Sequence, residues 1–322
     1  MKDIFAPLSQ DMQAIERALA DNLEPHVPLV KDVAGHILFS GGKRIRPLLM
    51  VLCARMCGRD GKEVHGLSTV FEYLHAATLL HDDVVDAATT RRGQPAAYTL
   101  FGGAVTILTG DFLFARTCSL ATATGKLPVI QTITDVTGVM SEGEIAQIGH
   151  RGDAELSEAQ YMEVITAKTA ALTSAACRVG ALFADAAEEK VKALTDFGLY
   201  FGLSFQIVDD LLDYTADPGK SGKKLGADLR EGKMTLPLIY TRQKADGETR
   251  AFLDQVIRCQ DPSPDDFSRV VAAMERFGGL SGARDKAREL VCRAKDGLAV
   301  FPPSPSRQIL TDLADFVISR DR

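Results

Sequence analysis

Apolar residues recur at intervals of three and four along nearly the whole chain, and strict alternation of apolar and polar residues is almost absent. Intervals of three and four place apolar side chains on one face of an α-helix, whereas a half-buried strand would alternate. The segment SEAQ at 157–160 also has the form of a capping box, which marks a helix start. The clearest periodic segments are 103–123, 128–148, 157–182 and 190–214. The pattern therefore predicts an all-α protein of roughly a dozen helices.

The length and composition suit a large globular core. The chain has 322 residues, of which 46% are hydrophobic, and this is enough for one large domain or two ordinary ones. Clusters rich in Gly, Pro, Ser and Asp interrupt the helical pattern, but none has the composition of a flexible linker. We therefore expect residues 1–322 to form a single domain.

The charge of the chain limits the partners that it can bind. The formal net charge is −6, which argues against a nucleic-acid-binding protein that uses a broad basic surface. We expect no nucleic-acid partner. Any anion that the protein binds must be met by local clusters of Lys and Arg or by a metal ion.

The cysteines and the N-terminus indicate a cellular compartment. The six cysteines are scattered without a CxxC pair, as in reduced core residues of a cytoplasmic protein. The first residues, MKDIFAPLSQDMQAIE, lack a signal-peptide core, and no apolar run approaches about 18 residues. We expect a cytoplasmic protein without a stable membrane anchor.

Three aspartates end an apolar segment in HAATLLHDDVVDAATTRRG, residues 75–93. If residues 64–88 form one helix, His75, Asp82 and Asp86 share a face and Asp83 lies on its flank. Crowded carboxylates repel each other, so a half-buried cluster needs a neutralising cation or must protonate. Mg²⁺ is a natural partner, because it binds one or two carboxylates together with substrate phosphate. A solvated helix end is the alternative.

The same pattern recurs in FQIVDDLLD, residues 205–213, as Asp209, Asp210 and Asp213. On a helix, Gln206, Asp210 and Asp213 share a face, with Asp209 to one side. One DDxxD is a weak signal, but two copies, each followed by basic residues, favour a functional site. The downstream residues are Arg91, Arg92, Lys223, Lys224 and Lys233.

Carboxylates, metal and basic residues together suit a diphosphate. The carboxylates would hold Mg²⁺, the metal would bridge phosphate oxygens, and Arg and Lys would balance the remaining charge. FSGGKRIRP, residues 39–47, offers Lys43, Arg44 and Arg46 beside two glycines, at the start of a helix whose first position suits Pro47. A basic cluster alone is usually a solvated turn, but a reaction between two diphosphates would need a second anion site.

Six motifs occur in a fixed order: GGKRIRP, HAATLLHDDVVDAATTRRG, TGDFL, AKTAAL, FQIVDDLLD and GKKLGADLREGKMTLP. With these motifs the chain, from about residue 30 to 320, resembles the all-trans polyprenyl diphosphate synthases, in particular the medium- and long-chain, octaprenyl-type members. These enzymes elongate an allylic diphosphate with isopentenyl diphosphate. The resemblance implies a single-domain helical bundle around a deep central cavity, a homodimer, and about three Mg²⁺ ions per active site.

The resemblance also implies roles for individual residues. Asp82, Asp86 and Asp209 would be the principal metal ligands, supported by Asp83, Asp210 and Asp213. The allylic diphosphate would be bound by Arg91, Lys168, Thr169, Gln206, Lys223 and Lys233, and isopentenyl diphosphate by Lys43, Arg46, His75 and Arg92. Either Lys223 or Lys224 could contact phosphate, because the family often has Pro at the second position. Asp111 of TGDFL is interpreted as structural.

The implied reaction is a Mg²⁺-assisted ionisation followed by condensation and deprotonation. Asp82, Asp86, Asp209, Lys168 and Lys233 would be the catalytic residues, because they would stabilise charge on the departing diphosphate. Thr169 and Gln206 would stabilise the allylic carbocation. No Ser/His or Cys/His arrangement suggests covalent catalysis.

Product length in this family is limited by bulky residues four and five positions before the first aspartate. Here these are Thr78 and Ala77, which are small, so we expect a medium- or long-chain product. Val136, Val139 and Met140 on the following helix are candidates for the residues that stop growth, and ordinary core packing is the alternative. The number of units, the primer and the downstream lipid are left open.

Four alternatives compete with this interpretation. A geranylgeranyl- or farnesyl-type short-chain synthase would share every motif. The pair His81 and Asp82 is also typical of HD-type phosphohydrolases, but that class leaves the second DDxxD unexplained. A class I terpene cyclase has no use for a second diphosphate site at Lys43, Arg46 and Arg92. A non-catalytic partner subunit normally has eroded aspartates, and both motifs are intact here.

Overall fold

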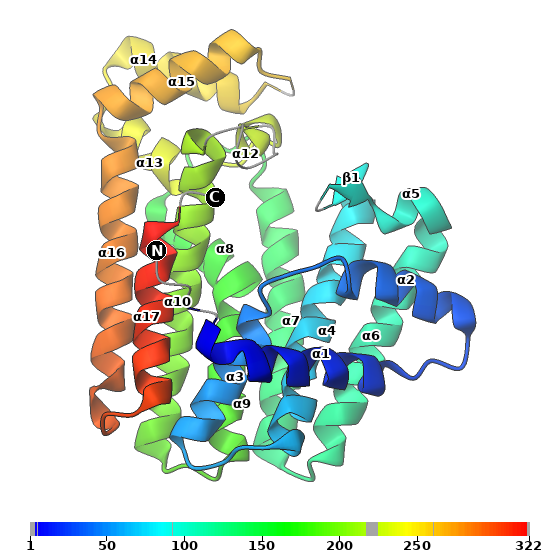
Figure 1. Ribbon diagram of the computed structural model, residues 1–322. Helices are drawn as coiled ribbons and strands as arrows, with labels where there is room; N and C mark the ends of the chain where they lie inside the picture. Colours follow the sequence, from blue (N-terminus) through cyan, green and yellow to red (C-terminus); the bar gives the residue numbers. More distant parts are fainter. Residues whose placement is uncertain (1–3, 5, 92, 217–224, 260, 321–322) are drawn as a thin grey trace. The chain divides into compact units, whose positions relative to one another are not determined.

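The computed structural model describes residues 4, 6–91, 93–216, 225–259 and 261–320 (Figure 1). Within these ranges the chain is helical apart from a short antiparallel pair of strands, β1 (Thr90–Arg91) and β2 (Gln94–Pro95). The predicted all-α fold is confirmed. The helices are η1 (Ala6–Leu8), α1 (Ser9–Leu23), α2 (Pro28–Leu38), α3 (Ile45–Met56), α4 (Lys62–Val85), α5 (Ala97–Phe101), α6 (Gly103–Ala123), α7 (Leu127–Gly149), α8 (Glu158–Ile165), η2 (Thr166–Ala170), α9 (Ala171–Phe183), α10 (Glu188–Thr215), α12 (Ala227–Arg230), α13 (Leu236–Lys244), α14 (Gly247–Ile257), α15 (Pro264–Arg276), α16 (Gly279–Gly297), η3 (Leu298–Val300) and α17 (Pro305–Ser319).

The chain divides into two compact units. Unit 1 comprises Met1–Thr137, Ala175–Thr195 and Val300–Leu310, and unit 2 comprises Gly138–Ser174, Asp196–Ala299 and Thr311–Arg322. That residues 1–322 form a single domain around a central cavity stays a prediction.

Unit 1 is built around α4, which packs against α1, α3 and α6. Figure 1 shows α1, in blue, lying across α3 and α4. Residues 47–54 of α3 are all buried, as expected of a helix that is apolar on every side. Gly180 of α9 allows a close approach to α3, because a Cβ there would lie 2.5 Å from the carbonyl oxygen of Met50.

Arg44 belongs to the framework of unit 1 and not to an anion site. Its guanidinium is buried and donates to Glu16 and to Glu72, each at 2.6 Å, and to the carbonyl oxygen of Leu38. Removing Arg44 would leave the buried Glu72 carboxylate without this partner, which is costly. Of the three basic residues of FSGGKRIRP, Lys43 and Arg46 are therefore left as candidates for phosphate binding. The helix itself begins at Ile45, two residues before the predicted Pro47.

In unit 2, α13 packs against α8, α14, α15 and α16. The predicted capping box begins α8: the Ser157 hydroxyl accepts from the Gln160 N–H at 3.3 Å, and the Gln160 side chain accepts from the Ser157 N–H at 3.0 Å. Between α8 and α9 the helix widens into one π-helical turn, η2. Such turns are frequent at functional sites, and η2 carries Lys168 and Thr169.

Two details differ from the sequence-based expectation. The helix predicted over 64–88 ends at Val85, because the chain turns at Ala87, whose φ is 50°. The cysteines are all free, as predicted, but only Cys53 and Cys177 are buried. Cys57 is half-buried, and Cys118, Cys259 and Cys292 are exposed, so the expectation of core cysteines was wrong for these three.

Candidate active site

The first aspartate motif lies at the end of α4 in unit 1. Asp82 is half-exposed and Asp86, the C-terminal cap of the helix, is exposed. Asp83 is fully buried and accepts from Arg91, whose Nε lies 2.8 Å from its Oδ1. The strand pair β1–β2 brings Arg91 back toward α4. Asp83 and Arg91 therefore form an ion pair, while Asp82 and Asp86 extend from the helix end. Arg92 lies outside the described residues.

His81 holds the end of α4 against α6. Its Nε2 lies 3.1 Å from the carbonyl oxygen of Ile107 and 3.4 Å from Asp111 Oδ1. Gly110 makes this contact possible, because a Cβ at that position would lie 2.3 Å from the same Nε2. The side chain of Asp111 thus contacts the helix that carries the motif, as the structural interpretation of TGDFL anticipates.

The second motif lies on α10 in unit 2, and its three aspartates have different surroundings. Asp209 is half-exposed and forms an ion pair with Arg320 at 2.8 Å. Arg320 also stacks on the ring of Phe205, with its guanidinium carbon 3.9 Å from the ring centre. Asp213 accepts from the backbone N–H groups of Ala227 and Asp228, at 3.1 and 2.9 Å, and so caps α12. Burial raises the pKa of Asp213 above its ordinary value, although these bonds oppose the shift.

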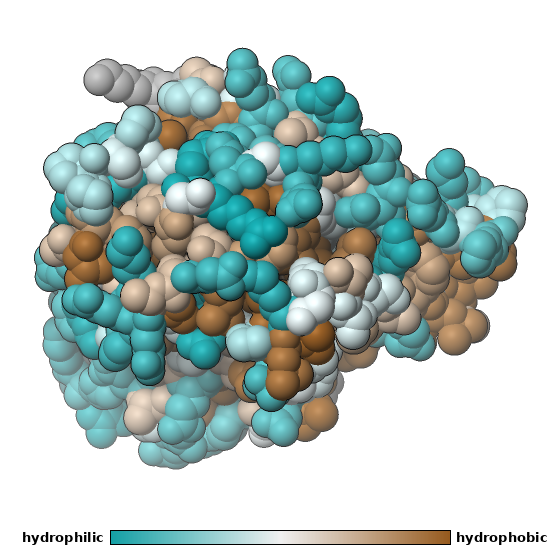
Figure 2. All heavy atoms as spheres, turned by 90° about the horizontal axis from the view of Figure 1, so that it is seen from below, coloured by the Kyte–Doolittle hydropathy of each residue, from teal (hydrophilic) through white to brown (hydrophobic). Residues whose placement is uncertain are grey.

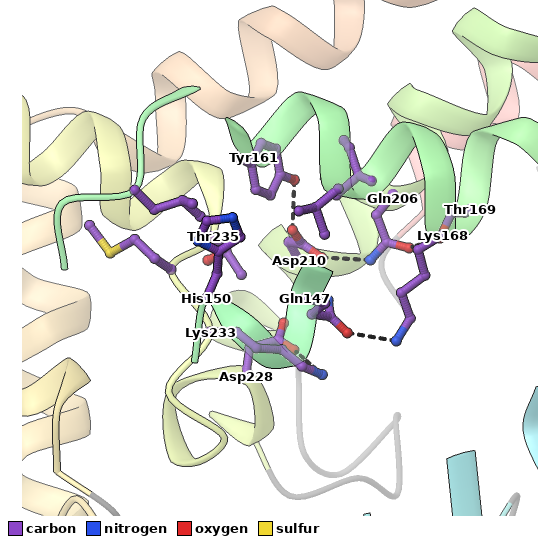
Figure 3. A pocket seen from close by; sticks show the side chains of 14 residues that line it. Gln147, His150, Tyr161, Lys168, Thr169, Gln206, Asp210, Asp228, Lys233 and Thr235 are labelled. Carbon is purple, nitrogen blue, oxygen red and sulfur yellow. Dashed lines mark hydrogen bonds and ion pairs between the residues drawn. The ribbon is translucent and has the colours of Figure 1, made fainter. Parts of the chain in front are cut away.

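Asp210 is buried, and side chains occupy both of its oxygens. The Tyr161 hydroxyl donates to Oδ2 and the Gln206 amide donates to Oδ1, each at 2.7 Å (Figure 3). Gln206 in turn accepts from the Thr169 hydroxyl at 2.8 Å. Burial, together with the nearby Asp228 carboxylate, raises the pKa of Asp210 well above its ordinary value.

Lys168 lies on η2, where two residues of α7 hold it. Its Nζ lies 2.6 Å from Glu144 Oε2 and 2.6 Å from Gln147 Oε1. Gly143 lets α7 approach η2 closely: a Cβ there would lie 2.8 Å from the backbone nitrogen of Lys168. The sequence reasoning did not identify Glu144 or Gln147. Their spacing of three residues puts Glu144 and Gln147 on one face of α7, but this helix carries other polar residues, so the spacing alone does not single them out.

Lys233 follows α12 and lies close to two acidic side chains. Its Nζ is 2.5 Å from Glu231 Oε2 and 3.6 Å from Asp228 Oδ1. Burial raises the pKa of Asp228 to about 6, although Lys233 opposes the shift. Lys223 and Lys224, the other predicted phosphate ligands of this loop, lie outside the described residues.

Several of the predicted substrate-binding residues of unit 2 line a cavity of about 90 Å³ (Figure 3). Polar side chains converge on it from α7, α8, η2, α10 and the segment after α12. The polar lining residues are Gln147, His150, Tyr161, Lys168, Thr169, Gln206, Asp210, Asp228, Lys233 and Thr235. The structure thus brings together Lys168, Thr169, Gln206 and Lys233, which the resemblance assigns to the allylic diphosphate, and Asp210, which it assigns to the support of the metal ligands.

The other predicted residues of unit 1 lie near helix ends or in the core. Lys43 is exposed beside Gly41 and Gly42, Arg46 is half-buried in the first turn of α3, and His75 is half-buried in α4. Thr78 is half-buried, and its hydroxyl donates to the His75 carbonyl at 2.9 Å. Of the remaining chain-length candidates, Ala77 and Val136 of unit 1 and Met140 of unit 2 are buried, whereas Val139 of unit 2 is exposed. Their role stays a prediction.

The carboxylates fit a divalent cation that is shared with a substrate. Among the described residues, no group of three or more His, Cys, Asp or Glu side chains is arranged to hold a metal ion. Asp82 and Asp86 nevertheless offer hard oxygen ligands at one helix end, and within the same described ranges the buried Oδ2 of Asp83 has no hydrogen-bond partner. Mg²⁺ usually keeps waters and binds only one or two carboxylates together with substrate phosphate. The donor set suits that mode of binding better than a closed protein cage.

Known proteins share this sequence and fold. Residues 27–274 match the family model of polyprenyl synthetases. The chain is 38% identical to the octaprenyl diphosphate synthase of Escherichia coli, over 98% of this chain and 97% of that protein. It is 35% identical to an all-trans-nonaprenyl-diphosphate synthase of Rhodobacter capsulatus, over 99% and 98% of the two chains.

Solved structures agree with this result. A polyprenyl synthase from Caulobacter crescentus, complexed with calcium and isoprenyl diphosphate, matches with a TM-score of 0.93 at 38% identity, covering 99% of this chain and 97% of that one. A decaprenyl diphosphate synthase from Rhodobacter capsulatus matches with a TM-score of 0.93 at 40% identity, covering 99% and 98%. The chain therefore belongs to the polyprenyl synthetase family and is a prenyltransferase of the medium- or long-chain all-trans type.

Proposed function

We propose that the protein condenses an allylic diphosphate, such as farnesyl diphosphate, with successive isopentenyl diphosphate units. The observation that carries the proposal is the convergence of Lys168, Thr169, Gln206 and Lys233 on one cavity. The two lysines supply positive charge for a diphosphate, and the two neutral side chains supply oxygen dipoles beside it. The proposal assigns isopentenyl diphosphate to Lys43, Arg46 and His75, with Arg92 outside the described residues.

Divalent cations complete the proposed site. Asp82, Asp86 and Asp209 would hold them, and the bound cations, about three per site as Mg²⁺, would supply Lewis-acid stabilisation of charge on the departing diphosphate. The calcium bound by the Caulobacter crescentus relative supports a divalent-metal requirement. We expect Asp83, Asp210 and Asp213 to support these metal ligands, because they already bind other groups of the protein. Asp83 binds Arg91, Asp210 binds Tyr161 and Gln206, and Asp213 binds the start of α12.

The chain's own residues have separate tasks in this reaction. Lys168 and Lys233 stabilise negative charge that develops on the leaving diphosphate. Thr169 and Gln206 present oxygen atoms toward the allylic carbon, where positive charge develops as the diphosphate leaves. The buried walls of the cavity, among them Val164 and Ile165, exclude water that would otherwise quench the cation.

We also propose that the protein is a cytoplasmic homodimer without a membrane anchor. Among the described helices, α6 alone is long and apolar enough to cross a membrane, and only a third of its most apolar window is buried. Its exposed apolar residues Ile107 and Leu108, with the exposed Leu100 of the preceding helix α5, are candidates for contact with a second copy. Figure 2 shows hydrophobic residues, in brown, at the right-hand edge of the face that it draws.

Sedimentation equilibrium tests the dimer. We expect a mass near twice 34.8 kDa in detergent-free buffer, and Leu108→Asp should shift it toward the monomer. A wild-type protein that is monomeric at all concentrations would contradict the proposed dimer. Co-sedimentation of the protein with lipid vesicles would contradict the proposal that it has no membrane anchor.

The reaction itself is tested by incubating the protein with labelled isopentenyl diphosphate, farnesyl diphosphate and Mg²⁺, and sizing the extracted products. We expect prenyl chains of more than about twenty carbons, since Ala77 and Thr78, five and four positions before Asp82, are small. Removing the cations with EDTA should abolish the product, and added Mg²⁺ should restore it. Phosphate release without condensation would instead indicate the hydrolase alternative.

Gly143→Ala tests how η2 is positioned. The added methyl would lie 2.6 Å from Ala167 Cβ and 2.8 Å from the Lys168 nitrogen, so η2 must move. We expect about a tenfold or greater loss of kcat, because small displacements in a site are costly. Gly138→Ala is the matched control: it lies on the same helix, and a Cβ there meets nothing within 4 Å. Equal kcat values for the two variants would show that the close approach has no role.

Ala77→Phe tests the chain-length assignment. A buried aromatic ring before the first motif should occupy the space into which the product grows and shorten it to about twenty carbons or fewer. Product size is read by chromatography after dephosphorylation, with circular dichroism to confirm folding. A folded variant with products of unchanged length would refute the assignment.

A further inference from the structure

The sequence motifs assign no task to Tyr161, although it lines the active-site cavity. Its side chain is buried in α8, and its hydroxyl donates to Asp210 Oδ2 at 2.7 Å (Figure 3). Burial and the adjacent Asp210 raise the pKa of this hydroxyl well above its ordinary value. The hydroxyl therefore stays protonated and acts as a donor.

Asp210 transmits this contact to a residue of the reaction site. Its second oxygen accepts from the Gln206 amide nitrogen at 2.7 Å, and the Gln206 amide oxygen accepts from the Thr169 hydroxyl at 2.8 Å. The chain of hydrogen bonds thus runs from α8 through α10 to η2. Tyr161 and Asp210 are buried, and Gln206 and Thr169 are half-buried where they line the cavity.

The order of donors and acceptors fixes the Gln206 amide. A primary amide can turn over and exchange its oxygen and nitrogen at little steric cost. As a carboxylate, Asp210 prevents this, because its Oδ1 then accepts from the amide NH₂ group and cannot pair with the amide oxygen. With the NH₂ group held by Asp210, the amide oxygen lies beside Thr169. The Thr169 hydroxyl donates its hydrogen bond to Gln206. The lone pairs of the hydroxyl oxygen can then face a cationic centre in the cavity.

Tyr161 is the member of the chain that fixes Asp210 itself. Without its hydroxyl, one oxygen of the buried Asp210 carboxyl would lose its side-chain donor, which is unfavourable for a buried polar group. The carboxyl would then turn toward another donor, and the Gln206 amide would no longer be held in one orientation. Asp210 is fixed from α8 and from α10, so its position depends on both helices.

We propose that Tyr161 is a positioning residue for the prenyl transfer reaction. Through Asp210 it fixes the orientation of the Gln206 amide. The oxygen atoms of Gln206 and Thr169 then face the carbon that loses diphosphate. The inference rests on the proposed function, because it concerns the ionisation step of that reaction. Tyr161 contacts no phosphate-binding lysine in the hydrogen-bond chain. Its effect therefore falls on the rate of the chemical step and not on substrate affinity.

The first experiment measures the single-turnover rate of the first condensation, with farnesyl diphosphate, isopentenyl diphosphate and Mg²⁺, in Tyr161→Phe. The maximal rate should fall about tenfold, a typical effect of removing a supporting hydrogen bond behind a ligand. The half-saturating concentrations of both substrates and of Mg²⁺ should change less than about twofold. Tyr214→Phe is the matched control, because it also removes a buried tyrosine hydroxyl. That hydroxyl lies 3.4 Å from the Thr235 hydroxyl and makes no hydrogen bond to Asp210. This variant should keep the wild-type rate.

The second experiment repeats Tyr161→Phe in an Asp210→Asn background. If Tyr161 acts through Asp210, the two losses are not additive, and the double variant should be no slower than Asp210→Asn alone. Fully additive losses would overturn the proposal. So would a Tyr161→Phe variant that keeps the wild-type rate, or one whose only change is weaker substrate or Mg²⁺ binding.

The outcomes also separate this inference from the proposed function. A wild-type protein that makes no prenyl product refutes the proposed function itself. A fully active wild type with an equally fast Tyr161→Phe variant refutes the positioning role alone. Unfolding of Tyr161→Phe, seen by circular dichroism, would assign Tyr161 to the framework and would also refute it.

Discussion

Carboxylates at the ends of two apolar helices, α4 in unit 1 and α10 in unit 2, are the constraint on which the proposed reaction depends. Like charges held at one helix end destabilise the fold unless cations balance them. In the structure, charged side chains of the protein supply part of this balance: Arg91 pairs with Asp83, and Arg320 pairs with Asp209. The lysine side chain of Lys168 is likewise neutralised within the protein, because it forms an ion pair with Glu144. These charged side chains are thus held in internal pairs, which a diphosphate and its cations would replace in the proposed reaction.

Close helix contacts give these charges their positions. Gly110 lets the His81 ring lie against α6, and Gly143 lets α7 reach the π-helical turn that carries Lys168. In both cases a glycine stands where a methyl group would collide with the neighbouring helix. The end of α4 and the turn that carries Lys168 are therefore positioned by close helix packing, which would suit a reaction that keeps a carbocation away from water.

The sequence predicted the helices and the candidate site residues more completely than the side chains that hold those residues in place. The intervals of apolar residues located α6, α7 and α10 closely, because packing and local propensity agree there. The second motif pointed to Gln206 and Asp210 of the unit 2 cavity, and the resemblance added Lys168, Thr169 and Lys233. Other features could not be predicted, because they depend on contacts between residues far apart in sequence: Arg320 against Asp209, Glu144 against Lys168, and Arg44 against Glu72. A basic triplet does not reveal which arginine turns inward.

The central claim is that the carboxylate motifs and the diphosphate bind divalent cations together. Calorimetric titration with a farnesyl thiodiphosphate, which ionises too slowly to react, tests this claim directly when it is done with Mg²⁺ and in EDTA. We predict that Mg²⁺ strengthens binding at least about tenfold and that the analogue strengthens Mg²⁺ binding by the same factor, because coupling is reciprocal. Asp82→Asn should remove most of this coupling. Equally tight binding in EDTA and in Mg²⁺ would contradict the account.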